Sequence, residues 1–484
     1  MSAPDTPDFR PKARRPRGLQ DRRGPALAVE AELVARISKV YEAWGFERLE
    51  TSAIEFADAL GKFLPDQDRP NEGVFAFQDD DEQWLSLRYD LTAPLARFVA
   101  ENFDALPKPY RRWAAGPVWR NEKPGPGRFR EFWQCDADTV GSASPAADAE
   151  LVAMACEALE AAGIARGGYQ LRISTRKLLD AVLEKIGVAA DAFATRLVVL
   201  RAIDKFDRLG RDGVAALLGS GRKDESGDFT KGAGLDAAQS KSVLDLVSAG
   251  AGSRGNVLGR LQGIAGDAAI ADLKEIDAVL SALGVDDKRA AFDPTIVRGL
   301  EYYTGAVFEA QLIGGDGASF GSVGGGGRYD DLVARFRGER IPATGFSVGV
   351  SRLAAALQAQ AKAEEANAPV VVLVMDQARI ADAFAMADEL RKAGVRAEAY
   401  LGGGGMKAQL KYADKRGAPV AVIQGGDELA KGVVTLKNLV LGAQMSDAAG
   451  SDREAWNEAR KQLQVEVKRE DLVESVKSIL SKKV

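Results

Sequence analysis

The chain has 484 residues, of which 46% are hydrophobic and 28% charged, a composition typical of a globular protein with two to four domains. Its formal net charge is −5, and it contains no histidine. The missing histidine excludes Ser-His-Asp and Cys-His catalysis, HExxH zinc sites and the kinase HRD loop. With only Cys135 and Cys156, neither a structural zinc site nor a disulfide framework is expected.

Residues 1–17 carry arginines and lysines broken by prolines, which predicts either a solvated tail or an arm that contacts RNA. The N-terminus has no apolar signal core, and no apolar run is long enough to cross a membrane. We therefore expect a protein of the reducing cytoplasm, with no membrane partner. A nucleic-acid partner would need a local basic patch, because the global charge is acidic.

Apolar spacing predicts a helix over 31–44, followed by a short strand at 48–54. Residues 74–88 alternate in polarity, which predicts two strands around an acidic turn. Two longer strands are predicted within 112–140, joined by the loop 123–127.

Ser144 and Pro145 open a clear helix, with serine as the N-cap, and the helix is expected to stop at Gly163. A strand at 169–173 then leads into a mostly helical region over 178–290. Further strands are expected at 304–313 and 343–350, followed by a linker at 358–368. From 369 onward, strands and helices alternate, which predicts a small α/β domain with a parallel or mixed sheet.

The densest functional signal lies in 108–138, where aromatic residues alternate with arginines. On paired strands, Arg120, Arg128 and Arg130 would converge on one face. Guanidinium groups bind phosphate in a fixed geometry, and a ring such as Phe132 can stack on a base. A salt-bridged hairpin surface is the alternative interpretation.

Glycine-rich segments give weaker signals. The glycines at 324–327 allow either a close approach of the backbone to a ligand or a flexible turn. No P-loop sequence is present. The segment 250–255 fits GxGxxG but follows a helix rather than a strand, which argues against a dinucleotide site.

Taken together, several motifs resemble the class II aminoacyl-tRNA synthetases, and in particular the histidyl-tRNA synthetase family. Segments 120–132 and 345–352 resemble class II motifs 2 and 3, and 298–303 and 326–330 resemble the two histidine signatures. Segments 16–18, 88–92, 227–235 and 469–473 also match the family. The resemblance covers nearly the whole chain from about residue 16.

The resemblance implies an α/β and α+β multidomain fold with a class II antiparallel-sheet catalytic core, a helical insertion and a C-terminal α/β anticodon-binding domain. It implies a tail at 1–17, a core in two parts at 18–177 and 291–357, an insertion at 178–290, a linker at 358–368 and an anticodon-binding domain at 369–484. The implied activity is that of a cytoplasmic homodimeric ligase that uses ATP with Mg²⁺ to join histidine to its tRNA through histidyl-adenylate. No permanently bound metal is expected.

The resemblance also implies roles for individual residues. ATP would be bound by Arg120, Glu122, Arg128, Phe132 and Arg352, with Arg120 and Arg298 as the catalytic residues that hold the α-phosphate. Histidine would be bound by Asp90, Thr92, Gln134, Asp138, Arg298, Tyr302 and Tyr303. Asp138 and Tyr303 would read the imidazole, and Tyr302 would either assist them or only pack.

Two departures from the family pattern stand out. Ser52 replaces a proline of motif 1, which puts the start of the dimer-forming strand in doubt. The loop 124–127 carries no polar side chain, which leaves open how the tRNA acceptor end is read.

Three other functions are compatible with parts of the pattern: a regulatory paralogue that senses histidine for ATP phosphoribosyltransferase, a noncatalytic RNA-binding sensor, and a class II synthetase for another amino acid. The segment 369–484 and the four arginines implied to hold ATP argue against the regulatory paralogue.

Overall fold

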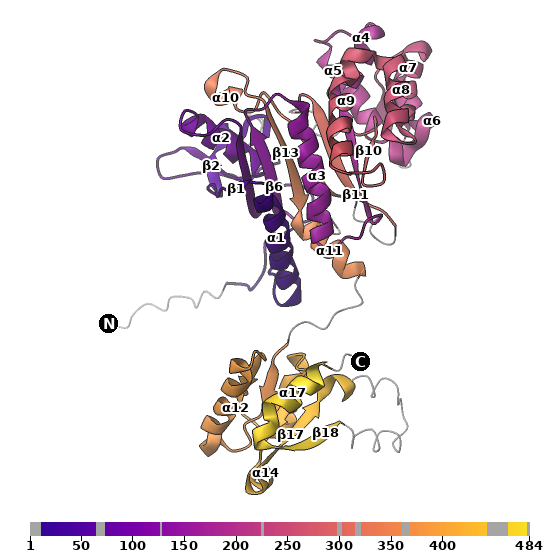
Figure 1. The fold of residues 1–484 in the computed structure, drawn as a ribbon. Coiled ribbons are helices and arrows are strands. Elements are labelled where there is room, and N and C mark those ends of the chain that lie inside the picture. Colours follow the sequence, from indigo (N-terminus) through magenta and orange to yellow (C-terminus); the bar gives the residue numbers. More distant parts are fainter. Residues whose placement is uncertain are drawn as a thin grey trace, which may run out of the picture. The chain divides into compact units, whose positions relative to one another are not determined.

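The computed structural model describes residues 11–63, 73–125, 128–223, 227–297, 303–314, 321–360, 368–442 and 463–481 (Figure 1). The chain divides into two compact units, Met1–Ala361 and Lys362–Val484. Each unit has its own clusters of buried hydrophobic residues. Burial of apolar side chains is the dominant favourable contribution to folding, so each unit has the means to be stable by itself.

A large sheet forms the centre of the first unit. Its strands run in the spatial order β1 (Glu47–Arg48), β5 (Tyr110–Trp119), β6 (Glu131–Val140), β13 (Ala343–Gly349), β12 (Ser322–Arg328), β11 (Ala306–Leu312), β7 (Tyr169–Thr175) and β10 (Ala290–Phe292). The central pairs are antiparallel, whereas the two outermost pairs, β1 with β5 and β7 with β10, are parallel. The expected antiparallel-sheet core is therefore confirmed.

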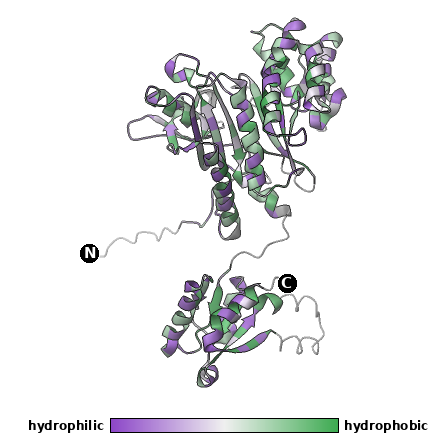
Figure 2. Cartoon of the chain, in the orientation of Figure 1, coloured by the Kyte–Doolittle hydropathy of each residue, from purple (hydrophilic) through white to green (hydrophobic). Residues whose placement is uncertain are grey.

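Helices α1 (Pro25–Ala43), α3 (Pro145–Ala161) and α11 (Val350–Gln360) pack against one another and against the sheet (Figure 1). Much of α3 is hydrophobic (Figure 2), and most of its residues are therefore buried in the core. The hydroxyl of Ser144 accepts a hydrogen bond from the Ala146 amide at 3.1 Å, which confirms the predicted N-cap. Helix α1 begins six residues before the expected 31, with proline in its first turn.

A small sheet lies beside the core, with strands β2 (Ile54–Phe56), β4 (Trp84–Leu87) and β3 (Ala76–Gln78). Two of these strands confirm the expected pair within 74–88. The expected strand at 48–54 is instead divided between β1 and β2, which belong to different sheets. Helix α2 (Thr92–Asn102) follows β4.

The region expected to be helical contains α4 (Arg176–Lys185), α5 (Phe193–Ile203), α6 (Phe206–Leu218), α7 (Ala237–Val247), α8 (Arg254–Ala265) and α9 (Asp267–Ala282), which gather at one end of the unit (Figure 1). A hairpin of β8 (Gly221–Lys223) and β9 (Phe229–Lys231) interrupts the helices. This hairpin was not expected from the sequence.

The glycine run 324–327 lies inside β12 and is hydrogen-bonded on both sides, to β11 and to β13. Of the two interpretations of this run, the flexible turn is therefore wrong. A Cβ atom on Gly326 would lie 2.0 Å from the Gly345 carbonyl oxygen, so only glycine allows β13 to approach this closely. The short helix α10 (Ala334–Arg337) follows.

The second unit is a small α/β domain. Its sheet has the order β15 (Ala397–Ala399), β14 (Val370–Val372), β16 (Val420–Ile423), β17 (Val433–Asn438) and β18 (Gln464–Lys468). The first three strands are parallel and the last two pairs are antiparallel, which confirms the expected mixed sheet. The helices described in full there include α12 (Ile380–Lys392), α13 (Met406–Lys415), α14 (Gly426–Lys431) and α17 (Leu472–Ser481).

Candidate active site

A cavity of about 470 Å³ opens on the large sheet of the first unit. It brings together ten of the twelve residues proposed from the sequence: Asp90, Thr92, Arg120, Glu122, Arg128, Phe132, Gln134, Asp138, Tyr303 and Arg352. The other two, Arg298 and Tyr302, lie outside the described residues. The cavity therefore joins motifs that are more than 200 residues apart in the sequence.

Strand β6 forms the floor of the cavity. Because side chains alternate along a strand, Phe132, Gln134, Asp136 and Asp138 share one face, and all four line the cavity. The strand rises by about 3.4 Å per residue, so roughly 20 Å separates the first from the last. This length accommodates two ligands placed end to end.

The end of the cavity near Phe132 carries cationic and aromatic groups. The guanidinium of Arg120 lies 4.3 Å from the ring centre of Tyr89 and 5.0 Å from that of Phe132. Glu122 accepts a hydrogen bond from the Tyr89 hydroxyl at 3.0 Å and forms an ion pair with Arg128 at 2.9 Å. Burial raises the pKa of Tyr89 to about 12, opposed by the charge of Arg120 and helped by Glu122, so this hydroxyl remains a donor at neutral pH.

Two further arginines differ in their placement. Arg352 enters the cavity from α11 and donates a hydrogen bond to the Ser322 carbonyl oxygen at 2.8 Å. Arg130, which the sequence placed on the same face as Arg120, does not line the cavity. Its guanidinium donates to the Glu122 carbonyl oxygen at 2.9 Å and therefore supports the hairpin backbone.

The opposite end of the cavity is acidic. Asp138 is buried, and its Oδ2 atom lies 2.9 Å from the guanidinium of Arg112, which faces it from β5. The Tyr329 hydroxyl donates a hydrogen bond to Oδ1. A Cβ atom on Gly345 would lie 1.9 Å from the same oxygen, so the glycine makes room for this carboxylate.

Asp136 lies between Gln134 and Asp138 on the same face and is only 2% exposed. Burial raises the pKa of Asp136 to about 8, helped by the charges of Asp138 and Asp90 and opposed by Arg112 and by a hydrogen bond from Ser347. The Gln134 amide also donates to the Ser347 hydroxyl, at 2.7 Å. The cavity floor therefore contains a carboxyl group that is largely protonated at neutral pH.

Asp90 is held at the start of α2. Its Oδ1 atom accepts hydrogen bonds from the backbone amides of Thr92 and Ala93, at 3.0 and 2.8 Å. Such a pair of bonds at a helix start fixes both the side chain and the first turn. The arrangement holds Asp90 and Thr92 together on the wall of the cavity.

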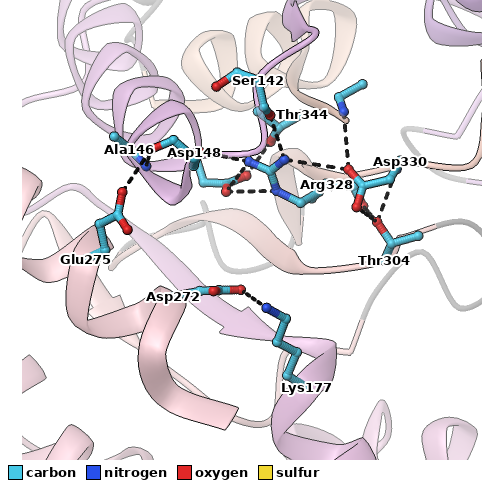
Figure 3. A network of polar contacts seen from close by, with 12 residues as sticks. Ser142, Ala146, Asp148, Lys177, Asp272, Glu275, Thr304, Arg328, Asp330 and Thr344 are labelled. Carbon is cyan, nitrogen blue, oxygen red and sulfur yellow. Dashed lines mark hydrogen bonds and ion pairs between the residues drawn. The ribbon is translucent and has the colours of Figure 1, made fainter. Parts of the chain in front are cut away.

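A polar network fixes Arg328, the last residue of β12, and Asp330, the two neighbours of Tyr329 (Figure 3). Arg328 forms an ion pair with Asp148 at 2.7 Å and donates to the Ser142 carbonyl oxygen at 2.8 Å. Thr304, which follows Tyr303, donates to Asp330 at 2.9 Å. The segment 326–330 therefore contributes mainly by positioning, and only Tyr329 and Gly326 among its residues reach the cavity.

The residues around the cavity that were not expected from the sequence include Tyr89, Arg112, Asp136 and Tyr329. Tyr89 and Tyr329 lie inside motifs that had been singled out, so those motifs carried a signal for them. Period-two alternation from Gln134 to Asp138 would have placed Asp136 on the cavity face. The role of Arg112 depends on strand register, which the sequence did not reveal.

The described parts of the chain contain no group of three histidine, cysteine, aspartate or glutamate side chains that could hold a metal ion. None of the helices there is long and apolar enough to cross a membrane.

The cavity lies on an antiparallel sheet and has one cationic and one acidic end. Motif 2 connects β5 to β6, and motif 3 lies on β13 and α11. This arrangement is that of the class II aminoacyl-tRNA synthetases. A family model described as histidyl-tRNA synthetase matches residues 18–353, and one described as anticodon binding domain matches 369–479. The chain belongs to the histidyl-tRNA synthetase family.

Individual relatives agree with this assignment. A histidine–tRNA ligase of Caulobacter vibrioides is 57% identical over 98% of both chains. One from Methylocella silvestris is 54% identical over the full length of both. A histidyl-tRNA synthetase structure from Nostoc sp. PCC 7120 superposes with a TM-score of 0.72 at 28% identity and covers 97% of this chain and all of its own.

Proposed function

We propose that this protein is a histidine–tRNA ligase that works in two steps. In the first, the carboxylate of histidine attacks the α-phosphorus of ATP, and pyrophosphate leaves. In the second, a hydroxyl of the terminal tRNA ribose attacks the carbonyl carbon of histidyl-adenylate, and AMP leaves. The observation that carries the proposal is the charge-divided cavity of a chain whose relatives bear this activity.

ATP would occupy the cationic end. Arg120, held between two aromatic rings, would contact the α-phosphate together with Arg298, while Arg128 and Arg352 would bind the terminal phosphate. Fixed cations stabilise the charge that develops on phosphate during transfer. Mg²⁺ would enter with the pyrophosphate portion of ATP, as part of the substrate.

The base would be bound beside these arginines. Glu122 would accept from the adenine amino group, and Phe132 would stack on the ring. In the structure Glu122 is paired with Arg128 and Tyr89, so nucleotide binding would rearrange these contacts.

Histidine would occupy the acidic end. Asp90, Thr92 and Gln134 would receive its α-ammonium group, and Asp138 and Tyr303 would read the imidazole, with Tyr302 beside them. A site built to hydrogen-bond a polar side chain rejects analogues that lack the partner groups by roughly 10⁴–10⁵, because the buried groups are then left unpaired. Such a site would not need an editing domain.

The tRNA would contact both units. Residues 369–484 would bind the anticodon, and the helical region 178–290 would hold the acceptor stem. Exposed basic side chains in that region support this role: Arg201, Arg208, Lys223 and Lys231. A cytoplasmic location belongs to the proposal, since tRNA is charged where proteins are made.

The test of the activity is amino-acid-dependent exchange of pyrophosphate into ATP. We expect histidine alone to drive exchange, and Arg120→Ala to lower it by roughly 10²–10³, the usual loss for one charge-stabilising donor. Arg166→Ala is the control, because that side chain is 70% exposed and is not among the residues that line the cavity. Exchange driven by another amino acid, or by none, would contradict the proposal.

A homodimer is the second part of the proposal. Three apolar side chains on the small sheet, Ile54, Phe56 and Phe77, are 42%, 55% and 42% exposed, and exposed apolar clusters mark interaction surfaces. In this family motif 1 forms the dimer contact, and a two-fold axis would bring the same sheet of two copies together.

The dimer is tested by light scattering after size exclusion. Phe56→Glu is expected to convert the dimer to a monomer, because a charge would be buried unpaired at the contact. Phe193→Glu, at a phenylalanine that is 76% exposed in α5, should leave the dimer unchanged. A wild-type monomer would exclude this assembly.

A further inference from the structure

Among the residues that the structure describes, three carboxyl groups line the acidic end of the cavity and only two guanidinium groups act on Asp136 there. Asp90, Asp136 and Asp138 all line this end, and the charges of the other two raise the pKa of Asp136. Two guanidinium groups, those of Arg112 and Arg88, lie close enough to influence Asp136. The partners of these two groups therefore decide whether Asp136 can remain ionised.

Both guanidinium groups have other partners. Arg112 forms its ion pair with Asp138 and donates to the Leu91 carbonyl oxygen at 2.8 Å. Arg88 donates to the carbonyl oxygens of Pro117 and Thr51, at 2.9 and 3.0 Å. Neither forms an ion pair with Asp136 among the described residues, so Asp136 has no dedicated counter-charge there.

The other titratable groups around Asp136 add no positive charge. Tyr41 on α1 and the adjacent Cys135 are buried, and burial raises the pKa of both, so each is neutral near pH 7. The Ser347 hydroxyl, which accepts a hydrogen bond from Gln134, acts on Asp136 as a hydrogen-bond donor. Within the described chain, Asp136 Oδ1 is buried with no hydrogen-bond partner, on a side chain that lines the cavity.

A buried carboxyl group with no counter-charge is stable only when protonated. A cation in the cavity would reverse this preference. The positive charge that histidine carries at neutral pH is its α-ammonium group, because the imidazole is mostly neutral there. Gln134, whose amide is proposed to receive that group, lies two residues before Asp136 in β6 and on the same face of the strand.

We propose that Asp136 is a further substrate-positioning residue, whose carboxyl group holds a proton in the protein without histidine and releases it when the α-ammonium group of histidine enters the acidic end. The O–H bond of the carboxyl group breaks, the proton passes to solvent, and the remaining negative charge pairs with the ammonium group. The inference rests on the proposed function, since it names a partner for the same amino acid in the same cavity.

The consequence is a proton released on binding. A group with a pKa of about 8 is about nine-tenths protonated at pH 7, so binding should release close to one proton from Asp136 at that pH. Histidine should also bind more tightly as the pH rises from 6 to 8, because a smaller fraction of Asp136 is then protonated before binding.

Titration calorimetry of histidine at pH 7, in two buffers with different heats of ionisation, measures the protons released. We expect Asp136→Asn to release at least half a proton less than wild type, the remainder coming from the imidazole of the ligand. Asp104→Asn, at an exposed carboxylate outside the cavity, should behave as wild type. Equal proton release in wild type and Asp136→Asn would overturn the inference.

Ser347→Ala provides a second test that keeps the carboxyl group in place. The serine hydroxyl lowers the pKa of Asp136, so its removal should move the pH of half-maximal proton release upward. An unmoved profile would also overturn the inference. Pyrophosphate exchange by the wild-type protein distinguishes a failure of this inference from a failure of the proposed function. Normal histidine-driven exchange without proton release would reject only the role of Asp136.

Discussion

The raised pKa of Asp136 should make the stability of the protein depend on pH. Its pKa is about 8 in the folded protein, against about 3.9 for an unperturbed aspartate, so the folded state binds this proton more tightly. The resulting stabilisation is complete below pH 4 and is lost as the pH rises through 8. Because the chain has no histidine, few other side chains titrate in the upper part of this window.

Asp136→Asn should therefore have a melting temperature close to that of wild type near pH 4, where the carboxyl group is still largely protonated in both states, and a higher one at pH 9. Asparagine keeps the size of the protonated acid and cannot ionise. We expect a difference at pH 9 of a few degrees, since about 1 kcal/mol corresponds to roughly 2–4 °C for domains of 150–250 residues. Calorimetric scans at the two pH values measure it, and equal melting temperatures at pH 9 would contradict the buried, uncompensated state of Asp136.

At the level of residues, the sequence predicted the side chains that lie within recognisable motifs. Arg120, Glu122 and Phe132 stand in one such motif and do line one cavity. Arg112 could not be assigned, because its contact with Asp138 requires the register of β5 against β6. Arg130 was misplaced because alternation does not hold outside a strand, and this residue lies just before β6.

At the level of elements, the glycine-rich strand β12 carries the sharpest prediction. Gly326→Ala should lower the melting temperature, because the new Cβ would meet the backbone of β13 at 2.0 Å and no side chain can move aside. Overpacking of this kind costs typically 1–3 kcal/mol and occasionally more. Thermal unfolding by circular dichroism measures the loss.

Gly325→Ala is the matched control in the same strand. Its Cβ would meet only the Phe308 carbonyl oxygen, at 3.4 Å, so the melting temperature should stay near that of wild type. If both variants lost the same stability, the cause would be the loss of glycine itself rather than the close approach of β13.

Elements with strong periodicity were predictable, and those with weak local signals were not. The N-cap of α3 and the strands around the turn of 74–88 followed from their sequences. Strand β12 did not, because glycine is depleted in strands and its reason for being there is the neighbouring strand. The β8–β9 hairpin is short and polar, so neither alternation nor apolar content marked it.

At the level of the whole molecule, the change in pattern after residue 368 predicted a separate C-terminal domain. The structure divides at Ala361, within the predicted linker 358–368. Local composition is enough to predict such a boundary, because a boundary needs only the end of one apolar pattern and the start of another. The joining of motifs from residues 88 to 352 into one cavity depended instead on the family resemblance, since the strand order of the large sheet is not local information.

The division into two units predicts that the two proposed steps can be separated. Every residue that lines the cavity belongs to the first unit, and that unit has its own hydrophobic core. A fragment of residues 1–361 should therefore keep histidine-driven pyrophosphate exchange. It should charge tRNA much less efficiently, because it would lack the proposed anticodon contacts; a loss of only 1.4 kcal/mol of binding free energy already lowers kcat/KM by about tenfold.

Exchange and aminoacylation assays on the fragment and the full chain measure the two steps, with a cooperative melting transition as the check on folding. Equal loss of both activities in a folded fragment would show that the second unit contributes to adenylate formation itself.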